Sequence, residues 1–310
     1  FYALPQAPQQ FKQILMASGF DRYFQIAPCF RDEDARADRS PGEFYQLDME
    51  MAFASQEDVF SIVEQVLPPV FEKYGIYKEA SKAPFVRIPY LEAMDKYGSD
   101  KPDLRIDLVL TDATEVMQGC GFAAFEGQTV KAIVVDDFTA TRKQIDAICA
   151  EVEVQTARKG FWFRVDENGE FVGGISKFLQ DRKEEVIKAL GLKNGDFVGL
   201  AAGKKLEAQK TAGVYRKLLG AASEKHMKKD CYEFCWIVDF PMYEIGEESG
   251  ELEFCHNPFS MPQGGMDALN NQDPLEILAY QYDLVCNGVE LSSGCLLYTS
   301  PSPRDRTRSR

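Results

Sequence analysis

FRDEDARADRSPGEFYQLD, at residues 30–48, is the stretch from which the fold of this chain is predicted. Phe30 leads into four charged residues, and a polar loop dense in charge follows as far as Gly42. The next run, residues 43–54, alternates between two kinds of side chain. Two strands joined by a charged loop are the simplest structure with this pattern.

The second of these strands has two faces of opposite character, because side chains alternate along a strand. Its apolar face, which needs a core, consists of Tyr45, Leu47, Met49 and Met51. Its other face consists of Phe44, Gln46, Asp48 and Glu50. Two carboxylates and an amide are costly to bury without partners, so a face of this kind is either solvated or holds a ligand. The pattern alone favours an exposed hairpin over a ligand site.

The order of residues in this stretch also resembles a motif of a known family. Phe30-Arg31-Asp32-Glu33, a loop, and then Arg39 and Phe44 resemble motif 2 of the class II aminoacyl-tRNA synthetases, and the whole string resembles the bacterial-type aspartyl-tRNA synthetases. The resemblance implies an α+β fold: an antiparallel-sheet catalytic core that carries a large inserted α/β domain of the GAD type. It also implies a cytoplasmic ligase that attaches L-aspartate to tRNA(Asp) from ATP, through aspartyl-adenylate. Whether tRNA(Asn) is charged as well stays open, because the anticodon-reading domain is absent.

Length and composition agree with a water-soluble enzyme. The chain has 310 residues, of which 45% are hydrophobic and 27% charged, as in globular proteins of two domains. No apolar run is long enough for a transmembrane helix, so no membrane partner is expected. A start without Met and without a leader pattern indicates an internal fragment. The net charge of -14 gives no support to broad electrostatic capture of nucleic acid, so tRNA binding rests on the resemblance.

Cysteine and histidine usage restricts the metal chemistry. The eight cysteines include no Cys-x-x-Cys pair, which favours reduced thiols over a zinc site. Only His226 and His256 are present, which excludes a His-rich metal centre. His256 begins the string HNPFSMP, which resembles the family segment whose histidine lies near bound aspartate.

The first helix is predicted over residues 8–18, with apolar residues at helical spacing. Its segment ALPQAPQQFKQ resembles the part of the family that contacts aspartate. The resemblance places Gln9 and Lys12 on the substrate, with Lys12 against the side-chain carboxylate. The remaining contacts that it implies are Arg31 on the α-phosphate as the catalytic residue and on aspartate, Glu33 on the adenine amino group, Phe44 stacked on adenine, Asp48 with Gln9 on the ammonium group, and Gln46 with His256 along the substrate pocket.

The segment QYDLVCNGVELSSG, residues 281–294, resembles the family strand that carries the metal and ATP carboxylates. The resemblance implies that Asp283 and Glu290 bind the Mg²⁺ of ATP and that Glu290 also contacts ATP. On a single strand these two residues have opposite parity, unless a bulge at Gly288 resets the register. The period of the segment leaves this point open.

A change in the pattern of predicted helices and strands, together with the resemblance, predicts the domain boundaries. Residues 1–105 and 231–294 form the two parts of the catalytic core, residues 106–230 form the insertion, and residues 295–310 are a non-family tail. The tail has four Arg and one Asp after residue 297 and has Leu297 where the family has an Arg for the aspartate side chain. With that cation missing, the 310-residue chain alone is not expected to activate aspartate, and the full-length enzyme is expected to be a homodimer.

Two alternative functions are considered. One is a related class II synthetase for asparagine or lysine, and the other is a non-catalytic paralogue that binds tRNA. A modest basic cluster in the predicted insertion is interpreted as a solvated helix face, with tRNA contact as its alternative; it consists of Lys204, Lys205, Lys210, Arg216 and Lys217.

Overall fold

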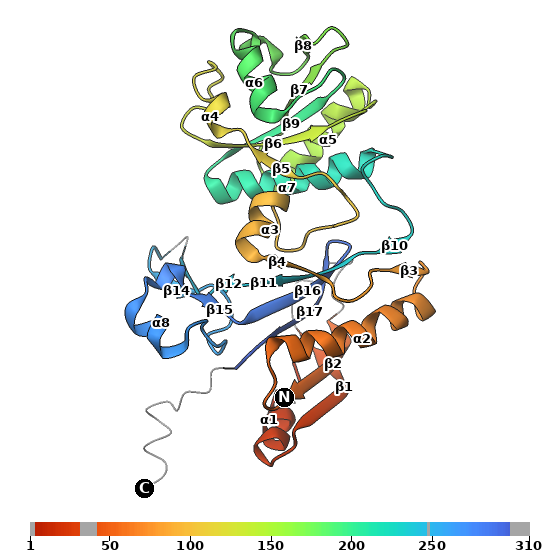
Figure 1. The fold of residues 1–310 in the computed structure, drawn as a ribbon, viewed down its shortest axis with the longest axis vertical. Helices are drawn as coiled ribbons and strands as arrows, with labels where there is room; N and C mark the ends of the chain where they lie inside the picture. The colour runs from red at the N-terminus through yellow and green to blue at the C-terminus, as the bar shows by residue number, and fades with distance from the viewer. Residues whose placement is uncertain (1–3, 32–41, 247–248, 298–310) are drawn as a thin grey trace. The chain divides into compact units, whose positions relative to one another are not determined.

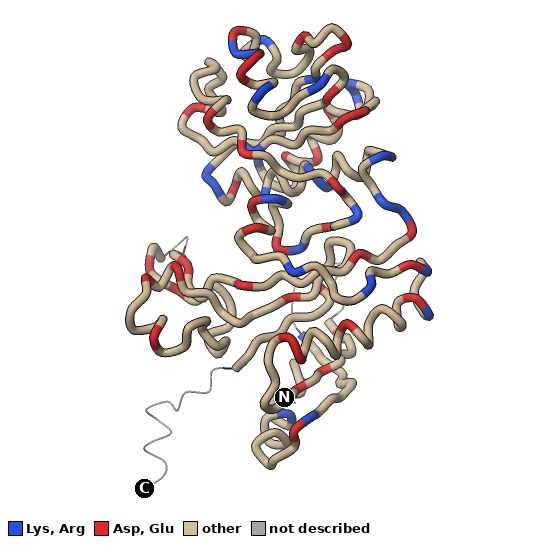
Figure 2. Tube along the Cα trace, viewed as in Figure 1, with Lys and Arg blue, Asp and Glu red and all other residues tan. Residues whose placement is uncertain are grey.

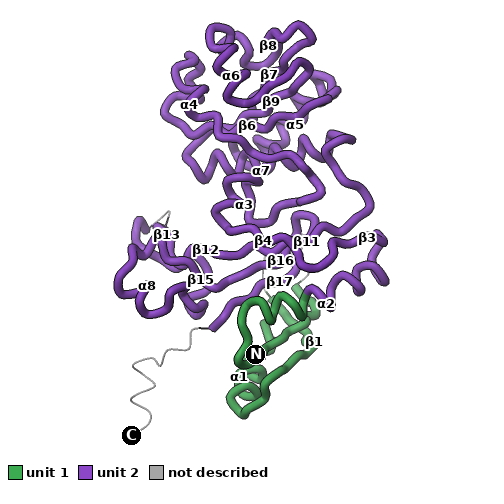
Figure 3. Tube along the Cα trace, in the orientation of Figure 1, with its two compact units in different colours: residues 1–63 green, residues 64–310 purple. Residues whose placement is uncertain are grey.

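The computed structural model describes residues 4–31, 42–246 and 249–297. The chain divides into two compact units, Phe1–Val63 and Glu64–Arg310, and the division falls inside a helix. Figure 1 gives the order of the elements, and Figure 3 gives the extent of the two units.

Unit 1 contains the predicted hairpin and a short helix. Its elements are α1 (Gln9–Ala17), β1 (Arg22–Phe30), β2 (Glu43–Met51) and the first part of α2 (Gln56–Tyr74). β1 and β2 are antiparallel, with Cys29 opposite Phe44 and Phe30 opposite Glu43. The prediction of two paired strands that flank the charged loop is therefore confirmed.

The two faces of this hairpin have the opposite exposure to the one the sequence predicts. The apolar side chains of Phe24 and Tyr45 are 72% and 70% exposed. The polar face, in contrast, includes the buried Asp48, which accepts a hydrogen bond from Lys12 of α1. The prediction that the apolar face has a core in this unit is wrong, because α1 is bonded to the polar face through ion pairs.

α2 begins with a side-chain cap and passes through two prolines. The backbone N–H of Ser55 donates to the Asp58 carboxylate at 2.8 Å, and the backbone N–H of Asp58 donates to the Ser55 hydroxyl at 3.3 Å. This is the reciprocal bonding of a capping box. Pro68 and Pro69 lie inside the helix, although proline lacks the N–H group that bonds to the preceding turn of a helix.

A four-stranded sheet in unit 2 joins segments that are distant in the sequence. Its strand order is β17-β16-β11-β4, with β4 parallel to β11 and the other pairs antiparallel. The strands are β4 (Val86–Pro89), β11 (Phe234–Val238), β16 (Gln281–Cys286) and β17 (Val289–Cys295). Its core includes Ile88, Cys235, Ile237 and Val285, with Ala93 from α3 (Tyr90–Tyr97) packed against them.

Short elements flank this sheet. β3 (Glu79–Ala80) pairs with β10 (Cys231–Tyr232), and β12 (Phe240–Pro241) pairs with β15 (Leu278–Ala279). A small hairpin of β13 (Tyr243–Ile245) and β14 (Leu252–Phe254) precedes α8 (Gly265–Asn271), and the single-turn helix η3 spans Pro274–Glu276. Beyond β17, Leu297 still forms an antiparallel bridge with Ser260.

A five-stranded antiparallel sheet forms the other half of unit 2, in the order β5-β6-β9-β7-β8. Its strands are β5 (Leu110–Asp112), β6 (Thr129–Val135), β7 (Phe161–Val165), β8 (Phe171–Val172) and β9 (Phe197–Gly203). The sequence pattern of this region allows α+β or α/β, and the resemblance implies an α/β domain. Because every pairing is antiparallel, the region is α+β, like the fold class expected for the whole chain.

Helices cover both faces of this sheet (Figure 1). The helices and single-turn helices are α4 (Thr114–Met117), α5 (Arg142–Thr156), η1 (Ser176–Phe178), η2 (Gln180–Arg182), α6 (Lys183–Leu190) and α7 (Lys205–Ala222). One core places Met117 and Val186 against Ala132 and Val198. The second core places Tyr215 of α7 against the opposite face.

α7 also packs against α3, and glycines make this contact possible. A Cβ at Gly98 would lie 2.2 Å from the Gln209 carbonyl oxygen, and one at Gly213 would lie 2.4 Å from the Gly98 carbonyl oxygen. Only glycine allows two backbones to approach this closely. The connector that follows α3, residues 98–109, thus starts on the surface of α7.

Arg216 of α7 holds this connector. Its guanidinium donates to the backbone carbonyls of Leu108, Ile106 and Asp103 at 2.5, 2.6 and 3.1 Å. The residue is 2% exposed, and burial lowers its pKa to about 10. The predicted solvated cluster is therefore wrong for Arg216; the four lysines of that cluster, Lys204, Lys205, Lys210 and Lys217, are exposed.

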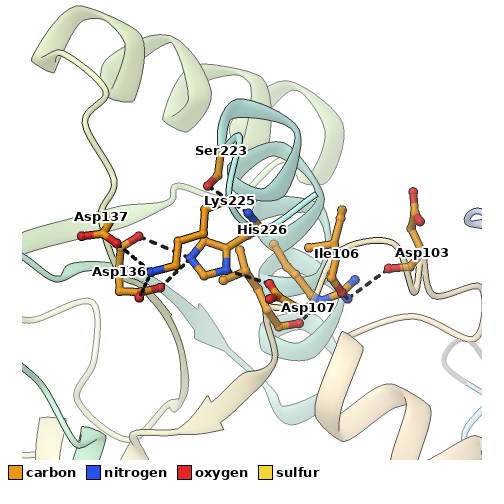
Figure 4. Close-up of polar contacts among 10 residues, drawn as sticks. Asp103, Ile106, Asp107, Asp136, Asp137, Ser223, Lys225 and His226 are labelled. Carbon is orange, nitrogen blue, oxygen red and sulfur yellow. Dashed lines mark hydrogen bonds and ion pairs between the residues drawn. The ribbon is translucent and has the colours of Figure 1, made fainter. Parts of the chain in front are cut away.

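A second polar cluster joins Asp107, Asp136 and Asp137 to Lys225 and His226 (Figure 4). The two imidazole nitrogens of His226 lie 2.7 Å from an Asp107 carboxylate oxygen and 2.6 Å from one of Asp136. The ammonium group of Lys225 pairs with Asp136 and Asp137. Figure 2 shows acidic and basic residues interspersed along the described chain.

Candidate functional site

The polar face of unit 1 contains a lysine between two carboxylates, here named the Lys12 cluster (Lys12, Asp48 and Glu50). The Nζ atom of Lys12 lies 2.8 Å from Asp48 Oδ1 and 3.3 Å from Glu50 Oε2. Asp48 and Glu50 are two residues apart on β2 and share a face. α1 brings the lysine to that face, so a nine-residue helix and one strand build the whole cluster.

The Lys12 cluster is largely shielded from water, which strengthens the electrostatic attraction between its charged groups. The side chain of Lys12 is 13% exposed. Burial alone lowers its pKa, but the hydrogen bond to Asp48 and the charges of Asp48 and Glu50 outweigh burial, so the pKa of Lys12 is raised. Asp48 Oδ2 is buried and accepts no hydrogen bond from any described residue. This oxygen can accept from one further donor, such as an ammonium group.

The other predicted residues of unit 1 lie as follows. The guanidinium carbon of Arg31 lies 5.0 Å from the centre of the Phe44 ring, a cation–π distance. The amide oxygen of Gln46 lies 3.6 Å from the Cys29 sulfur, and Gln9 is exposed at the start of α1. Glu33 lies outside the described residues. Gln46 and Asp48 share the polar face with Phe44, so three predicted residues project from one side of one strand.

Asp283 and Glu290 belong to two strands rather than to one. β16 and β17 form an antiparallel hairpin whose turn contains Asn287 and Gly288, with φ angles of 51° and 81°. Two consecutive residues with positive φ are typical of the type I′ turn, for which Asn-Gly is the strongest sequence signal. The prediction of one continuous strand is wrong because it overlooked this dipeptide.

The β16–β17 hairpin shows on which face of the sheet Asp283 and Glu290 lie. Glu290 lies opposite Val285, which is two residues from Asp283 along β16. Opposite residues of an antiparallel pair lie on one face, so both carboxylates are on the same side of the sheet. The register irregularity lies between Leu284 and Val285, not at Gly288.

Burial makes Asp283 an unusual carboxyl group. It is 5% exposed, and burial raises its pKa to about 7; a hydrogen bond with Ser293 lowers that pKa in part, and the charges of Glu290 and Asp100 raise it further. Its Oδ1 atom is buried without a hydrogen-bond partner among the described residues. An approaching cation would find a ligand atom there that is already free of protein donors.

A lysine again neutralises the neighbouring carboxylate. The Nζ atom of Lys101 lies 2.8 Å from Glu290 Oε2, and we name Lys101, Asp283 and Glu290 the Lys101 cluster. The sequence does not single out Lys101, because YGSDKPDLR, residues 97–105, has only the pattern of a turn-rich connector. The alternation of acidic and basic residues in that string was the signal available in the sequence.

His256 lies beside aromatic rings in unit 2. Its imidazole is edge-on to Phe240 at 5.0 Å and to Tyr90 at 6.4 Å between ring centres. Desolvation lowers its pKa, while the charges of Asp100, Glu244 and Glu290 oppose that shift. His256 therefore shares its electrostatic surroundings with the Lys101 cluster and favours the neutral imidazole.

Asp283 and Glu290 fit a magnesium ion that arrives with phosphate. Mg²⁺ takes oxygen ligands and is usually held by one or two carboxylates together with substrate phosphates. The unpartnered Asp283 Oδ1 and the same-face Glu290 supply such oxygens. Among the described residues no group of three or more His, Cys, Asp and Glu could hold a metal ion by itself. The donor set therefore suits a metal that is shared with a ligand.

Comparison with known proteins connects these clusters to a family. The chain is 56% identical over 303 residues to "Aspartate--tRNA ligase" of Streptomyces coelicolor, covering 97% of this chain and 51% of that protein. It is 51% identical over 312 residues to "Aspartate--tRNA(Asp/Asn) ligase" of Rickettsia felis, covering 97% of this chain and 52% of that protein. The chain thus spans about half the length of the curated relatives that it matches.

A solved structure, "Aspartyl tRNA synthetase from Entamoeba histolytica", matches 98% of this chain and 40% of that chain with a TM-score of 0.40 and 15% identity, a likeness too low to carry an argument. In the described part of the chain, no helix combines the length and the apolar character that a membrane crossing requires. The family model for tRNA synthetases class II (D, K and N) matches residues 1–304, beyond residue 294, where the resemblance was expected to end. Together with relatives above 50% identity, this match shows that the chain belongs to the class II tRNA synthetases of the D, K and N group.

Proposed function

We propose that this chain is part of a ligase that attaches L-aspartate to tRNA(Asp) through aspartyl-adenylate, with ATP as the energy source. The observation that supports this most is the Lys12 cluster, in which a cation and a buried carboxylate lie 2.8 Å apart. The chain that carries it is 56% identical to an aspartate–tRNA ligase. The asparagine and lysine enzymes of the same family are the alternatives, and the amino-acid preference decides among them.

Aspartate is complementary to the charges of the Lys12 cluster. Its ammonium group pairs with Asp48, whose Oδ2 atom has no protein donor, and Gln9 adds an amide oxygen. Its side-chain carboxylate pairs with Lys12, which remains protonated because its pKa is raised. Binding therefore exchanges the Lys12–Asp48 ion pair for two ion pairs between protein and ligand, while Lys12 keeps its contact with Glu50.

Adenylate formation needs positioning and charge neutralisation more than covalent chemistry. The aspartate α-carboxylate oxygen bonds to the α-phosphorus of ATP, and the bond from that phosphorus to the bridging oxygen of pyrophosphate breaks. Arg31 suits the α-phosphate, because a guanidinium binds phosphate oxygens through paired hydrogen bonds. Phe44 stacks on adenine. The Arg31 side chain, which lies over the Phe44 ring in the absence of ligand, moves away from the ring to bind the phosphate. Glu33 accepts a hydrogen bond from the adenine amino group.

Unit 2 supplies the acidic side chains for the phosphates. Asp283 and Glu290 would hold Mg²⁺, which offsets phosphate charge when bound. Glu290 also contacts ATP. The resemblance assigns His256 to aspartate as a neutral hydrogen-bonding group, in keeping with its lowered pKa.

The relatives also suggest the wider setting. The Rickettsia felis relative is named for tRNA(Asp/Asn), so tRNA(Asn) is a second candidate acceptor. We propose that the full-length enzyme is a cytoplasmic homodimer, as the resemblance implies.

We propose that residues 1–105 and 231–294 form the catalytic core and residues 106–230 an insertion. Two observations support this division. β4 pairs with β11 across the whole insertion, and all strands of the five-stranded sheet lie between Leu110 and Gly203. The proposed tail, residues 295–310, lies mostly outside the described residues.

Pyrophosphate exchange tests the proposal. Residues 1–294 of this chain replace the matching part of the Streptomyces coelicolor relative, whose own sequence continues from there, and aspartate-dependent exchange of pyrophosphate into ATP is measured. Arg31→Ala should lower the rate about a hundredfold or more, since loss of a charge-assisted contact to the reacting phosphate costs about 3 kcal/mol. Arg22→Ala, at the other end of β1, is the matched control and should leave the rate unchanged. Near-normal exchange in Arg31→Ala would refute the assigned role.

A further inference from the structure

Lys101 is a cation placed on a proposed metal ligand. Its ammonium group contacts Glu290 at 2.8 Å, and its side chain is 35% exposed. Asp283, on the same face of the hairpin, retains an oxygen without a protein donor. The Lys101 cluster thus holds one lysine for two carboxylates and leaves one ligand oxygen open.

The backbone around Lys101 is fixed on both sides. On one side, Arg216 donates to the carbonyls of Asp103 and Ile106. On the other, a Cβ on Gly288 of the β16–β17 turn would lie 3.3 Å from the Asp103 Cβ and 3.7 Å from the Lys101 carbonyl oxygen. The connector therefore lies against the turn between β16 and β17. This packing fixes the backbone of Lys101 where its side chain contacts Glu290.

A lysine in this place competes with a bare metal ion. A divalent cation that approaches Glu290 has to displace the ammonium group or to share the carboxylate with it at a like-charge cost. A cation that arrives with a polyphosphate brings negative charge, to which the displaced ammonium group can move. The exchange is then one ion pair for another, as in other charge-compensated sites.

We propose that Lys101 is a positioning residue that holds Glu290 in the absence of nucleotide and keeps free divalent cations off the Asp283–Glu290 pair. The site then accepts a metal only together with an anionic phosphate ligand. This inference rests on the proposed assignment of the metal to Asp283 and Glu290, and it adds a determinant that the resemblance does not supply.

Binding of Mn²⁺ alone, followed by its paramagnetic resonance signal on the 310-residue chain, tests the inference without reference to activity. Lys101→Met keeps the aliphatic length but removes the charge, and it should bind Mn²⁺ roughly tenfold more tightly than the original chain. Lys101→Arg restores the cation and should return the affinity to the original value. Lys101→Gln serves if Lys101→Met does not fold.

Two further variants separate the inference from the proposed function. Glu290→Gln or Asp283→Asn, added to Lys101→Met, should abolish the gain in Mn²⁺ affinity. Equal Mn²⁺ binding by the original chain and by Lys101→Met, or binding by neither, overturns the role of Lys101. If Lys101→Met binds more tightly but the gain survives both carboxylate changes, the metal assignment in the proposed function fails instead.

Discussion

The Lys12 cluster of unit 1 and the Lys101 cluster of unit 2 use the same three charges in different ways. Each combines one lysine with two carboxylates, and in each one buried carboxylate oxygen, on Asp48 or on Asp283, has no donor among the described residues. Lys12 contacts both of its carboxylates, whereas Lys101 forms its ion pair with Glu290 among the described residues. Burial then raises the pKa of Asp283 to about 7.

This difference relates charge compensation to the kind of ligand expected. A fully bridged pair suits a ligand that carries both signs, such as an amino acid, because each protein charge exchanges one partner for another. A half-compensated pair suits a cation that brings its own anion, such as a metal bound to phosphate, because the open Asp283 oxygen takes the metal and the displaced ammonium group pairs with the anion. The two lysines also reach their positions differently: Lys12 on a short helix, and Lys101 on a connector that Arg216 holds in place.

The largest expected effect comes from removing that anchor. Arg216→Met leaves three buried carbonyls without their donor, which should lower the free energy of unfolding by about 3–5 kcal/mol. Lys217→Met, the next residue of α7 and exposed, should change it by less than about 0.5 kcal/mol. Urea denaturation followed by tryptophan fluorescence measures both. Similar midpoints for the two variants would show that the connector is held by other contacts.

The next effect concerns aspartate. Lys12→Met, in the full-length exchange assay, leaves the side-chain carboxylate of the substrate without its partner and should raise KM for aspartate. Loss of one partner of a desolvated pair costs roughly 2–5 kcal/mol, or about thirty- to several-thousandfold. The exposed Lys143 of α5 provides the control variant Lys143→Met. An unchanged KM would place the aspartate side chain elsewhere.

A smaller effect follows from the pKa of Asp283. Because burial raises that pKa from 3.8 to about 7, the folded state holds a proton between these pH values that the unfolded state has released. Stability from this group is present at low pH and is lost as the pH rises through about 7. In EDTA, the free energy of unfolding should fall by roughly 1–3 kcal/mol between pH 5 and pH 8 relative to Asp283→Asn. Asp267→Asn, an exposed change on α8, should keep the original slope. Parallel curves for the original chain and Asp283→Asn contradict the shift.

Local pattern predicted much of the fold. The alternation in residues 43–54 predicted the β1–β2 hairpin, because this signal depends on neighbouring residues. The exposure of the two hairpin faces could not be predicted this way. Which face α1 covers depends on the ion pairs of Lys12, and those become visible only when helix and strand are placed together.

The site in unit 2 shows the same limit. Asn287-Gly288 could have identified the β16–β17 hairpin and hence the common face of Asp283 and Glu290. Lys101 lies far from both in the sequence, and its role depends on the packing of the connector between Arg216 and Gly288. Arg216 itself looked like a surface residue because helical spacing does not distinguish an exposed cation from one that binds buried carbonyls.

The central claim is that Asp283 and Glu290 bind the metal ion of ATP and that Asp48 binds the ammonium group of aspartate. Anomalous diffraction from Mn²⁺ in a crystal tests this claim most directly. The crystal contains the full-length enzyme that carries this chain, with Mn²⁺, aspartate and an ATP analogue that cannot be cleaved between the α- and β-phosphates. We predict a manganese peak about 2.1 Å from oxygens of Asp283 and Glu290, Lys101 moved away from Glu290, and the aspartate ammonium group on Asp48 Oδ2. A metal held by phosphate without either carboxylate, or Lys101 still paired with Glu290 beside a bound metal, would contradict the account.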